Sequence, residues 1–598
     1  MTIKSVDFSA VTLYNNSNKL YNEVSIQMIY EEQLKLWLEK ATKDSDLIDE
    51  LNSVKNDEAE VSDRFYRDLE FGTGGLRGVI GAGTNRMNIY TVGKATQGLA
   101  QYINQKYDNR SVAIAYDSRI KSEKFARYAA TIFAANGIKV HLYSELMPTP
   151  MLSYAVRYLN CSAGVVVTAS HNPSKYNGYK VYGPDGCQLT IDDANNVLSI
   201  IETIDIFDGV KTADFDECIA SGSIEFIGEE CINSYLETVK SYSINSDALK
   251  SSDLSVVYTP LNGAGNKPVR AILDMVGIKN VTVVKSQEMP DGNFPTAPYP
   301  NPEIRQAFEQ ALIVAKEVNP DLLLATDPDS DRVGIAVNDN GEYVLMSGNE
   351  VGVLLIDYIL TERKKHGTLP EKPVAVKTIV TTDLAAKVAE AHGCEIRNVL
   401  TGFKFIGEQI GLLEKDGEED RYVFGFEESY GYLAGGYVRD KDAVIASMLI
   451  CEMAAFYKAQ GKTLLERMNE LYNEYGYYLH RQLSFAYEGQ SGMETMNEIM
   501  TSLRNEPPTA IGGYNVTVVN DYLTSKSTCI KCGETKEITL PKSNVIGFEL
   551  DGGNSVIVRP SGTEPKIKIY LSAVGESAKA TADICDKLAA DMTEITKK

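Results

Sequence analysis

The sequence lacks any apolar run long enough to cross a bilayer. The longest apolar stretch lies around residues 443–456 and is interrupted by Glu452, whereas a membrane-spanning helix needs about 20 apolar residues. The first residues also lack the apolar segment that is typical of a secretory signal. We therefore expect a cytoplasmic protein without a membrane partner.

Positive charge is also scarce. Lysine and arginine together number 59 against 82 aspartates and glutamates, which gives a formal net charge of -23. An acidic chain repels nucleic acid and anionic lipid, so we expect neither as a partner. An anionic substrate would have to meet a local cluster of arginine, lysine and backbone amide groups.

Cysteine is sparse and mostly isolated. Of the nine cysteines, only Cys529 and Cys532 have the spacing of metal ligands. One Cys-x-x-Cys without a second pair, or a nearby histidine pair, is a weak indication of zinc. We interpret the two residues as unlinked thiols in a hairpin of a reduced protein.

What the chain does contain is a repeated alternation of helical and strand patterns. At 598 residues it is too long for one core. From residue 92 the alternation is typical of layered α/β domains with parallel strands, and it recurs after an acidic stretch near 205–230 and again from Asn349. After about residue 460, close-set strands with one closing helix favour an antiparallel α+β domain. We expect four domains, the first three of one kind, over residues 1–212, 213–340, 341–462 and 463–598.

A buried strand followed by a polar loop is the first candidate site. The β-branched run 165–167 predicts a strand, which must end at Asn172-Pro173 because proline supplies no backbone donor. Ser170 and His171 then lie at the carboxyl end of the strand, the edge where open α/β sheets bind ligands. Taken alone, Ser170 could equally belong to an ordinary turn.

A glycine-rich segment over residues 71–78 carries Arg77. It does not fit a dinucleotide fingerprint, because Arg77 stands where the third glycine belongs, and no Gly-Lys-Ser/Thr closes it as a phosphate-binding P-loop. We expect a flexible loop that presents one arginine.

Three carboxylates alternate directly after the strand pattern at 321–326. Asp327, Asp329 and Asp331 would repel one another unless a cation neutralises them. An EF-hand is excluded by Arg332 and Asn338, and the oxygen-rich loop fits Mg²⁺ shared with a phosphate. Two alternatives stay open, namely the Asp-x-Asp-x-Val nucleophile of haloacid-dehalogenase phosphatases and a solvated acidic turn.

Two further segments suit a sugar and a phosphate. Glu427 and Ser429, among glycines, offer acceptors and a hydroxyl for sugar hydroxyls, although exposed glutamate pairs are common. The segment 559–566 begins with Arg559, whose guanidinium can bind phosphate through two parallel hydrogen bonds. Its alternative is a hairpin turn with incidental charge.

Four motifs in this order resemble the active-site loops of the α-D-phosphohexomutase superfamily. They read TASHNP, DPDSDR, FEESYG and RPSGTEP, and FGTGGLRG resembles the longer bacterial phosphoglucomutases, which are akin to phosphopentomutases. The resemblance covers the chain from about Tyr66 onward. It implies three related α/β domains and a C-terminal α+β domain around one central cleft.

The resemblance also implies roles for single residues. Ser170 would be the phosphoserine, and it would hold Mg²⁺ together with Asp327, Asp329 and Asp331. The residues implied around the reaction centre are Arg77, His171, Lys180 and Arg332. Those implied for the substrate's sugar and phosphate are Thr401, Gly402, Lys404, Glu427, Ser429, Arg559, Ser561, Gly562 and Thr563. Some relatives carry a histidine where Tyr430-Gly431-Tyr432 stand here, which leaves Lys180 or Lys404 as the proton carrier.

The implied activity is interconversion of glucose 1-phosphate and glucose 6-phosphate through a phosphoserine and a bisphosphorylated sugar. Mg²⁺ would be the cofactor and glucose 1,6-bisphosphate the activator, in a monomer or small homo-oligomer. Alternatives are a pentose or mannose phosphate mutase, a Mg²⁺ phosphatase built on Asp329, and a sugar-phosphate sensor.

Overall fold

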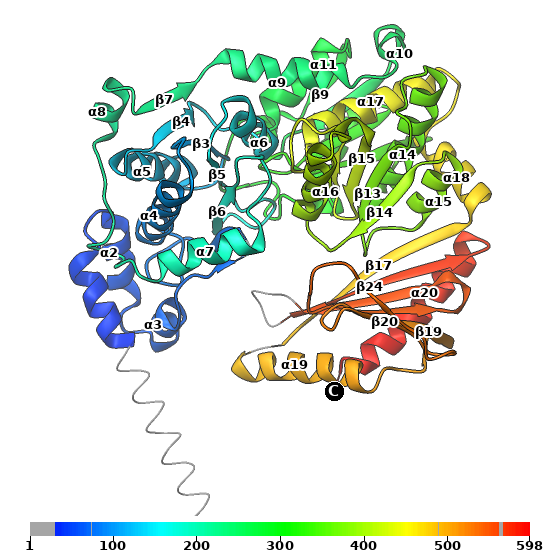
Figure 1. Cartoon of the computed structure of the whole chain (residues 1–598). Coiled ribbons are helices and arrows are strands. Elements are labelled where there is room, and N and C mark those ends of the chain that lie inside the picture. The colour runs from blue at the N-terminus through cyan, green and yellow to red at the C-terminus, as the bar shows by residue number, and fades with distance from the viewer. Residues whose placement is uncertain (1–29, 73, 488, 561–565, 598) are drawn as a thin grey trace, which may run out of the picture.

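A computed structural model describes residues 30–72, 74–487, 489–560 and 566–597. The four sheets follow one another along the chain, from the blue and cyan first domain to the orange and red fourth (Figure 1). Expectations for residues 1–29, and for Ser561, Gly562 and Thr563, lie outside the described residues. None of the helices in the described ranges has the length and apolarity to cross a membrane.

The first three sheets share one strand plan. Each contains a block of four strands ordered fourth, third, first, second along the chain. The first three strands of each block are parallel and the fourth is antiparallel. The blocks are β3 (Ser111–Tyr116), β4 (Lys139–Tyr143), β5 (Ala163–Val167) and β6 (Tyr176–Tyr182); β8 (Ser255–Thr259), β9 (Asn280–Val283), β10 (Leu322–Thr326) and β11 (Val333–Asp339); and β13 (Val374–Thr378), β14 (Glu395–Val399), β15 (Tyr422–Glu427) and β16 (Gly431–Leu433). The expectation of three related α/β domains is therefore confirmed.

Helices cover these sheets, which explains the unbroken apolar runs of their central strands. All five residues of β5 and of β10 are buried, as expected for strands with helices on both faces. The helices of the first three domains are α2 (Ser45–Val54), α3 (Glu58–Phe65), α4 (Ile89–Lys106), α5 (Ser122–Ala135), α6 (Thr149–Tyr158), α7 (Ile191–Ile201), α8 (Phe215–Ala220), α9 (Glu229–Ser241), α10 (Ser246–Ser251), α11 (Asn266–Met275), α12 (Lys285–Glu288), α13 (Glu309–Val318), α14 (Gly348–Lys365), α15 (Leu384–Ala391), α16 (Phe403–Lys415), α17 (Ala443–Lys458) and α18 (Leu464–Tyr475).

The glycine-rich segment is a hairpin rather than the flexible loop we expected. Strands β1 (Phe71–Gly72) and β2 (Gly75–Val79) pair with each other, and β2 continues the first sheet beside β6. At Gly75 φ is +148°, and a Cβ there would lie 1.9 Å from the carbonyl oxygen of Tyr179. Glycine thus lets two strands approach closely and fixes Arg77 on an ordered strand.

Two strands lie beyond the expected domain boundaries. Strand β7 (Ile224–Ile227) pairs with β4 in the first sheet, and β12 (Glu342–Met346) pairs with β11 in the second. Since paired strands belong to one folding unit, we propose that the first two domains end after these strands rather than at 212 and 340.

The fourth sheet is antiparallel throughout. Its strands are β17 (Tyr477–Ala486), β18 (Ala510–Ile511), β19 (Tyr514–Asp521), β20 (Lys526–Cys529), β21 (Thr535–Glu537), β22 (Ile546–Leu550), β23 (Ser555–Pro560) and β24 (Lys566–Gly575). The α+β expectation is confirmed, but two helices accompany the sheet instead of one, namely α19 (Gly489–Asn505) and α20 (Ala578–Ile595). All nine cysteines are free, so Cys529 and Cys532 are unlinked thiols beside the turn that joins β20 to β21.

The single tryptophan anchors the amino-terminal helices to the first domain. Residues 30–40 are helical, and Trp37 is fully buried. Its ring makes edge contacts with Phe65, Tyr90 and Phe207 at centroid distances of 6.0, 5.6 and 5.4 Å. Because these rings come from three distant segments, the aromatic cluster ties residues 30–66 to the α/β layers.

The glutamate that interrupts the longest apolar stretch has a structural role. Glu452 lies fully buried in α17 and accepts hydrogen bonds from the backbone amides of Ile244 and Asn245, at 2.8 and 2.9 Å, and from the Tyr358 hydroxyl at 2.8 Å. The Ser243 hydroxyl is a further donor. A buried carboxylate is tolerated when its lone pairs are satisfied in this way, and here it fixes the segment between α9 and α10.

We expect Glu452→Ala to destabilise the protein by about 3 kcal/mol, because two buried amides and a buried hydroxyl would lose their acceptor. Urea unfolding followed by circular dichroism would measure the loss. The control is Glu390→Ala, which removes a glutamate whose side chain is 79% exposed and should stay within about 0.5 kcal/mol of the parent. Equal midpoints for the two variants would contradict the structural role.

Candidate active site

Three of the four motif loops occupy equivalent places in the three related domains. Each follows the third strand of its block and precedes the antiparallel fourth, after β5, β10 and β15. The loops also meet in space. Ser170 Oγ lies 3.1 Å from Asp327 Oδ2, and Arg332 Nη1 donates to the carbonyl oxygen of Ser429 at 3.1 Å. One contact joins the first domain to the second, and the other joins the second to the third.

Each of the three loops contains a residue in the left-handed region. The φ angles are 53° at Ser170, 50° at Ser330 and 65° at Tyr430. A non-glycine residue there costs about 1–3 kcal/mol and persists only where its surroundings enforce it. Such residues concentrate at functional sites, which supports a common site for these loops.

Arg119 holds the Ser170 loop in shape. Its guanidinium donates to four carbonyl oxygens of the loop, those of Ser170, Asn172, Pro173 and Tyr176. Arg119 is fully buried and also pairs with Asp117 at 3.2 Å. Our sequence analysis missed this role, although Arg119 follows a strand as the recognised motifs do.

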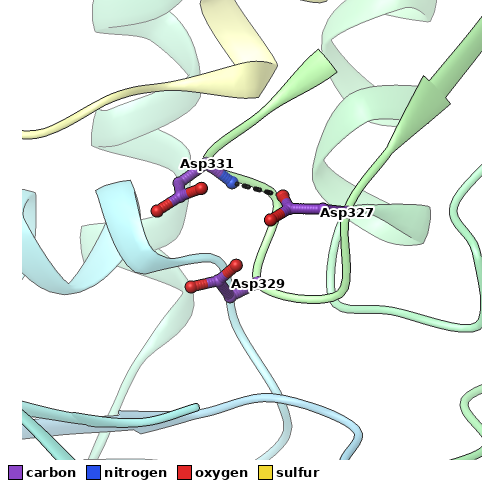
Figure 2. Close-up of side chains that lie close together, drawn as sticks. All are labelled: Asp327, Asp329 and Asp331. Carbon is purple, nitrogen blue, oxygen red and sulfur yellow. Dashed lines mark hydrogen bonds between the residues drawn. The ribbon is translucent and has the colours of Figure 1, made fainter. Parts of the chain in front are cut away.

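The three aspartates form one buried cluster (Figure 2). Oxygen atoms of Asp327, Asp329 and Asp331 lie within 4.8 Å of one another. Burial, and then the charges of Asp329 and Asp331, raise the pKa of Asp327 well above its ordinary value. Among the described residues, Asp329 Oδ1 and Asp331 Oδ1 have no hydrogen-bond partner. Buried, unpaired carboxylate oxygens from three neighbouring groups are the donor set that Mg²⁺ requires, so these residues fit the expected ion.

Two lysines balance the cluster. Lys180 Nζ lies 2.8 Å from Asp329 Oδ2 and 3.5 Å from Asp331 Oδ2, and Lys441 Nζ lies 3.2 Å from Asp331 Oδ2. Burial opposes the charge on Lys180, but the two carboxylates outweigh it and raise the pKa of this lysine. Sequence reasoning missed Lys441. The signal was the run of alternating charge over 439–442, whose four residues are all buried.

His171, Arg332 and Arg77 surround the serine, as expected. His171 Nδ1 is 3.2 Å from Ser170 Oγ, and Arg332 Nη1 pairs with Glu303 at 2.8 Å. Burial and the positive charges of Arg332 and Arg77 hold the pKa of His171 well below its ordinary value, so the imidazole is neutral near pH 7. Arg77 lies on β2 opposite Gly178, within electrostatic range of the aspartates.

The third domain contributes a polar patch around Glu427. Glu427 is buried, and its Oε1 accepts a hydrogen bond from the backbone amide of Gly402 at 2.9 Å, which links the two expected sugar-binding segments. Within the described part of the chain, Thr401 Oγ1 and Lys404 Nζ lack hydrogen-bond partners. Burial lowers the pKa of Lys404. These groups are free to bind a ligand.

The fourth domain approaches from its own sheet. Arg559 on β23 lies directly opposite Lys568 on β24. Like charges facing each other across a sheet are destabilising, so this pair favours an anion between them. Lys568 is a further residue that sequence reasoning missed, although it follows the expected phosphate loop. A cavity of about 320 Å³ separates this sheet from the third domain and is lined by Glu428, Ser429 and Tyr570.

Comparison with known families agrees with the four domains. Models of the phosphoglucomutase/phosphomannomutase family match in order: α/β/α domain I at residues 68–206, domain II at 233–341, domain III at 347–475 and the C-terminal domain at 537–591. The four matches span most of the described chain.

Curated relatives and solved structures agree with these matches. The chain is 38% identical over 512 residues to the phosphoglucomutase of Staphylococcus haemolyticus, covering 85% of this chain and 91% of the relative. It is 37% identical over 543 residues to that of Staphylococcus aureus, covering 90% and 95%. A putative phosphomannomutase from Thermus thermophilus shares the fold at 22% identity, with a TM-score of 0.67 and coverage of 89% and 100%. Parafusin, a phosphoglucomutase from Paramecium, does so at 18% identity, with a TM-score of 0.66 and coverage of 89% and 95%. Over 90% of its own length and nearly all of a close relative's, this chain belongs to the phosphoglucomutase/phosphomannomutase family.

Proposed function

We propose that the protein is a phosphoglucomutase that interconverts glucose 1-phosphate and glucose 6-phosphate. The observation that carries the proposal is the position of Ser170 Oγ, 3.1 Å from Asp327 in the aspartate cluster, with Lys180 ion-paired to the same cluster. The relatives from two Staphylococcus species, each named phosphoglucomutase, support the choice of activity.

The reaction transfers one phosphoryl group twice. The phosphorus–oxygen bond of phosphorylated Ser170 breaks as a bond forms to the free 6- or 1-hydroxyl of the sugar, and the hydroxyl proton passes to a basic side chain. The resulting glucose 1,6-bisphosphate reorients and returns its other phosphoryl group to Ser170. Since enzymes catalyse phosphoryl transfer mainly by positioning and charge stabilisation, the site needs fixed cations rather than a strong nucleophile.

The charged residues have separate roles in this scheme. Asp327, Asp329 and Asp331, together with the Ser170 side chain, would hold Mg²⁺, which supplies charge neutralisation to the transferring phosphoryl group. Lys180 and Arg77 flank Ser170, and Lys180 or Lys404 is the candidate proton carrier. Arg332 is fixed by Glu303 and by the carbonyl of Ser429, so its guanidinium lies between the second and third loops.

The substrate is held at its opposite end by the third and fourth domains. Glu427, Ser429, Thr401, Gly402 and Lys404 would bind sugar hydroxyls. Arg559, opposite Lys568, would bind the phosphate that is not reacting, together with Ser561, Gly562 and Thr563. A single site for that phosphate requires the intermediate to turn over between the two transfers. Free glucose 1,6-bisphosphate would act as activator by phosphorylating unmodified Ser170.

Ser170→Ala should abolish mutase turnover and leave the fold intact, because the hydroxyl that carries the phosphoryl group is lost. Intact-mass measurement of the parent should show a phosphorylated form that is absent from the variant. Ser162→Ala serves as a matched control, since that serine lies just before β5 and outside the loop. Full activity in Ser170→Ala, or release of inorganic phosphate by that variant, would favour the phosphatase alternative instead.

Asp329→Asn and Arg559→Ala should give opposite kinetic phenotypes. The aspartate faces the transferring group, so its loss, like removal of divalent metal, should lower kcat by several orders of magnitude with a modest change in KM. The arginine would bind phosphate equally in ground and transition states, so its loss should mainly raise KM. Steady-state kinetics separates the two effects, and interchanged phenotypes would show that the loops are wrongly assigned.

Glucose 1-phosphate should be preferred to mannose 1-phosphate and, more strongly, to ribose 1-phosphate. Glu427 and Ser429 would bind the adjacent 3- and 4-hydroxyls of a glucopyranose, which a ribofuranose cannot present. A site with buried hydrogen-bonding groups rejects a ligand that leaves them unpaired. Mannose differs at the 2-hydroxyl, which these residues need not contact. Comparison of kcat/KM for the three substrates tests the order, and ribose 1-phosphate as the best substrate would identify a phosphopentomutase.

A further inference from the structure

The two cysteines at the turn between β20 and β21 are the only accessible thiols of the chain. Cys532 is exposed and Cys529 is partly exposed, whereas the other seven cysteines are buried. The pair has no part in the proposed reaction. Two accessible thiols three residues apart are a chemical site that needs its own explanation.

The backbone of the turn is ordered around the sulfur of Cys529. The backbone amide of Cys532 donates to Cys529 Sγ at 3.4 Å, and the amide of Gly533 donates to the Cys529 carbonyl oxygen at 2.9 Å. The two thiols are also within hydrogen-bond reach of each other. Gly533 adopts a φ of +71°, which glycine does without strain, and this closes the turn. An amide directed at sulfur stabilises a thiolate, the form that binds metal.

The turn lies far from the proposed active site within the fourth sheet. Val558, Ile546, Asp521 and Lys526 face one another across β23, β22, β19 and β20, near the end of the sheet that carries Arg559. Strand β20 runs away from that end, so Cys529 lies three strands from β23 and about 10 Å further along. Changes at the turn should therefore leave turnover unaltered.

The chain supplies only half of a tetrahedral metal site here. Zinc in structural sites takes four ligands, commonly four thiolates in two Cys-x₂-Cys pairs. Across the ranges that the structure describes, the one group of three or more potential ligands close enough to hold an ion is the aspartate cluster. The remaining ligands at Cys529 and Cys532 must come from another molecule.

A second copy of the chain suits the missing half. The turn is at the outer edge of the sheet, since β21 pairs with β20 alone in the sheet order, and Ile530 between the cysteines is 46% exposed. Residues 526–537 carry three lysines and two glutamates, in a chain whose net charge is -23. Two such hairpins would offset the double negative charge of a zinc ion with four thiolates, and a two-fold axis lets the same patch meet itself.

We propose that Cys529 and Cys532 form a zinc half-site that is completed by the same two residues of a second copy, so that the metal links two chains into a dimer. Binding forms four zinc–sulfur bonds and releases the thiol protons to solvent. No electron transfer is involved. The site is independent of the proposed mutase activity.

Cobalt(II) and zinc titrations of the reduced, metal-free full-length protein test the proposal, with excess Mg²⁺ present to occupy the aspartate cluster. Cobalt should give a thiolate-to-metal charge-transfer band, which carboxylates cannot produce, and zinc should abolish it at one ion per two chains. Sedimentation velocity should show a monomer-to-dimer shift at the same ratio. Cys529→Ser and Cys532→Ser should each lose the band and the dimer while keeping mutase activity, and Cys218→Ala should behave as the parent.

Three results would overturn the proposal. A band that survives both serine variants would place the thiolates elsewhere. One zinc ion per chain without a change in sedimentation would show that a single chain completes the shell. Loss of two hydrogens from the intact mass in air, with no metal bound by the reduced protein, would identify the pair as a redox dithiol.

Discussion

The repulsion among three buried carboxylates is the constraint on which the site depends. Asp327, Asp329 and Asp331 occupy one short loop, and burial makes their mutual repulsion severe. Lys180 from the first domain and Lys441 from the third bring compensating charge. The neutralisation of one loop of the second domain therefore requires its neighbours on both sides, which couples the electrostatics of the cluster to the assembly of three domains.

The strand plan explains how three separate loops reach the same place. Each loop leaves the third strand of an equivalent four-strand block and returns through an antiparallel fourth strand. The same topological position thus supplies Ser170 in the first domain, the carboxylates in the second and Glu427 with Ser429 in the third. Identical scaffolds with different loop residues separate the proposed tasks of carrying the phosphoryl group, binding metal and binding sugar.

The fourth domain completes the arrangement by different means. Its antiparallel sheet presents Arg559 and Lys568 side by side, a pairing that is unfavourable without an anion. The cavity between this sheet and the third domain has Glu428 and Ser429 on one wall and Tyr570 on the other. A site divided between two domains in this way can admit a substrate and then exclude water, which would protect a phosphoserine from hydrolysis.

Local chemistry explains what the sequence alone determined. Apolar strands ending in Ser170 and in Asp327 predicted the α/β class, the loop positions and the metal ligands, because strand burial and carboxylate repulsion are properties of short segments. Partners from distant segments could not be predicted in this way. Arg119, Lys441 and Lys568 gain their roles only when folding brings them to a loop, a carboxylate and a like charge. Tertiary structure decided those contacts, since no local pattern encodes which distant residues will meet.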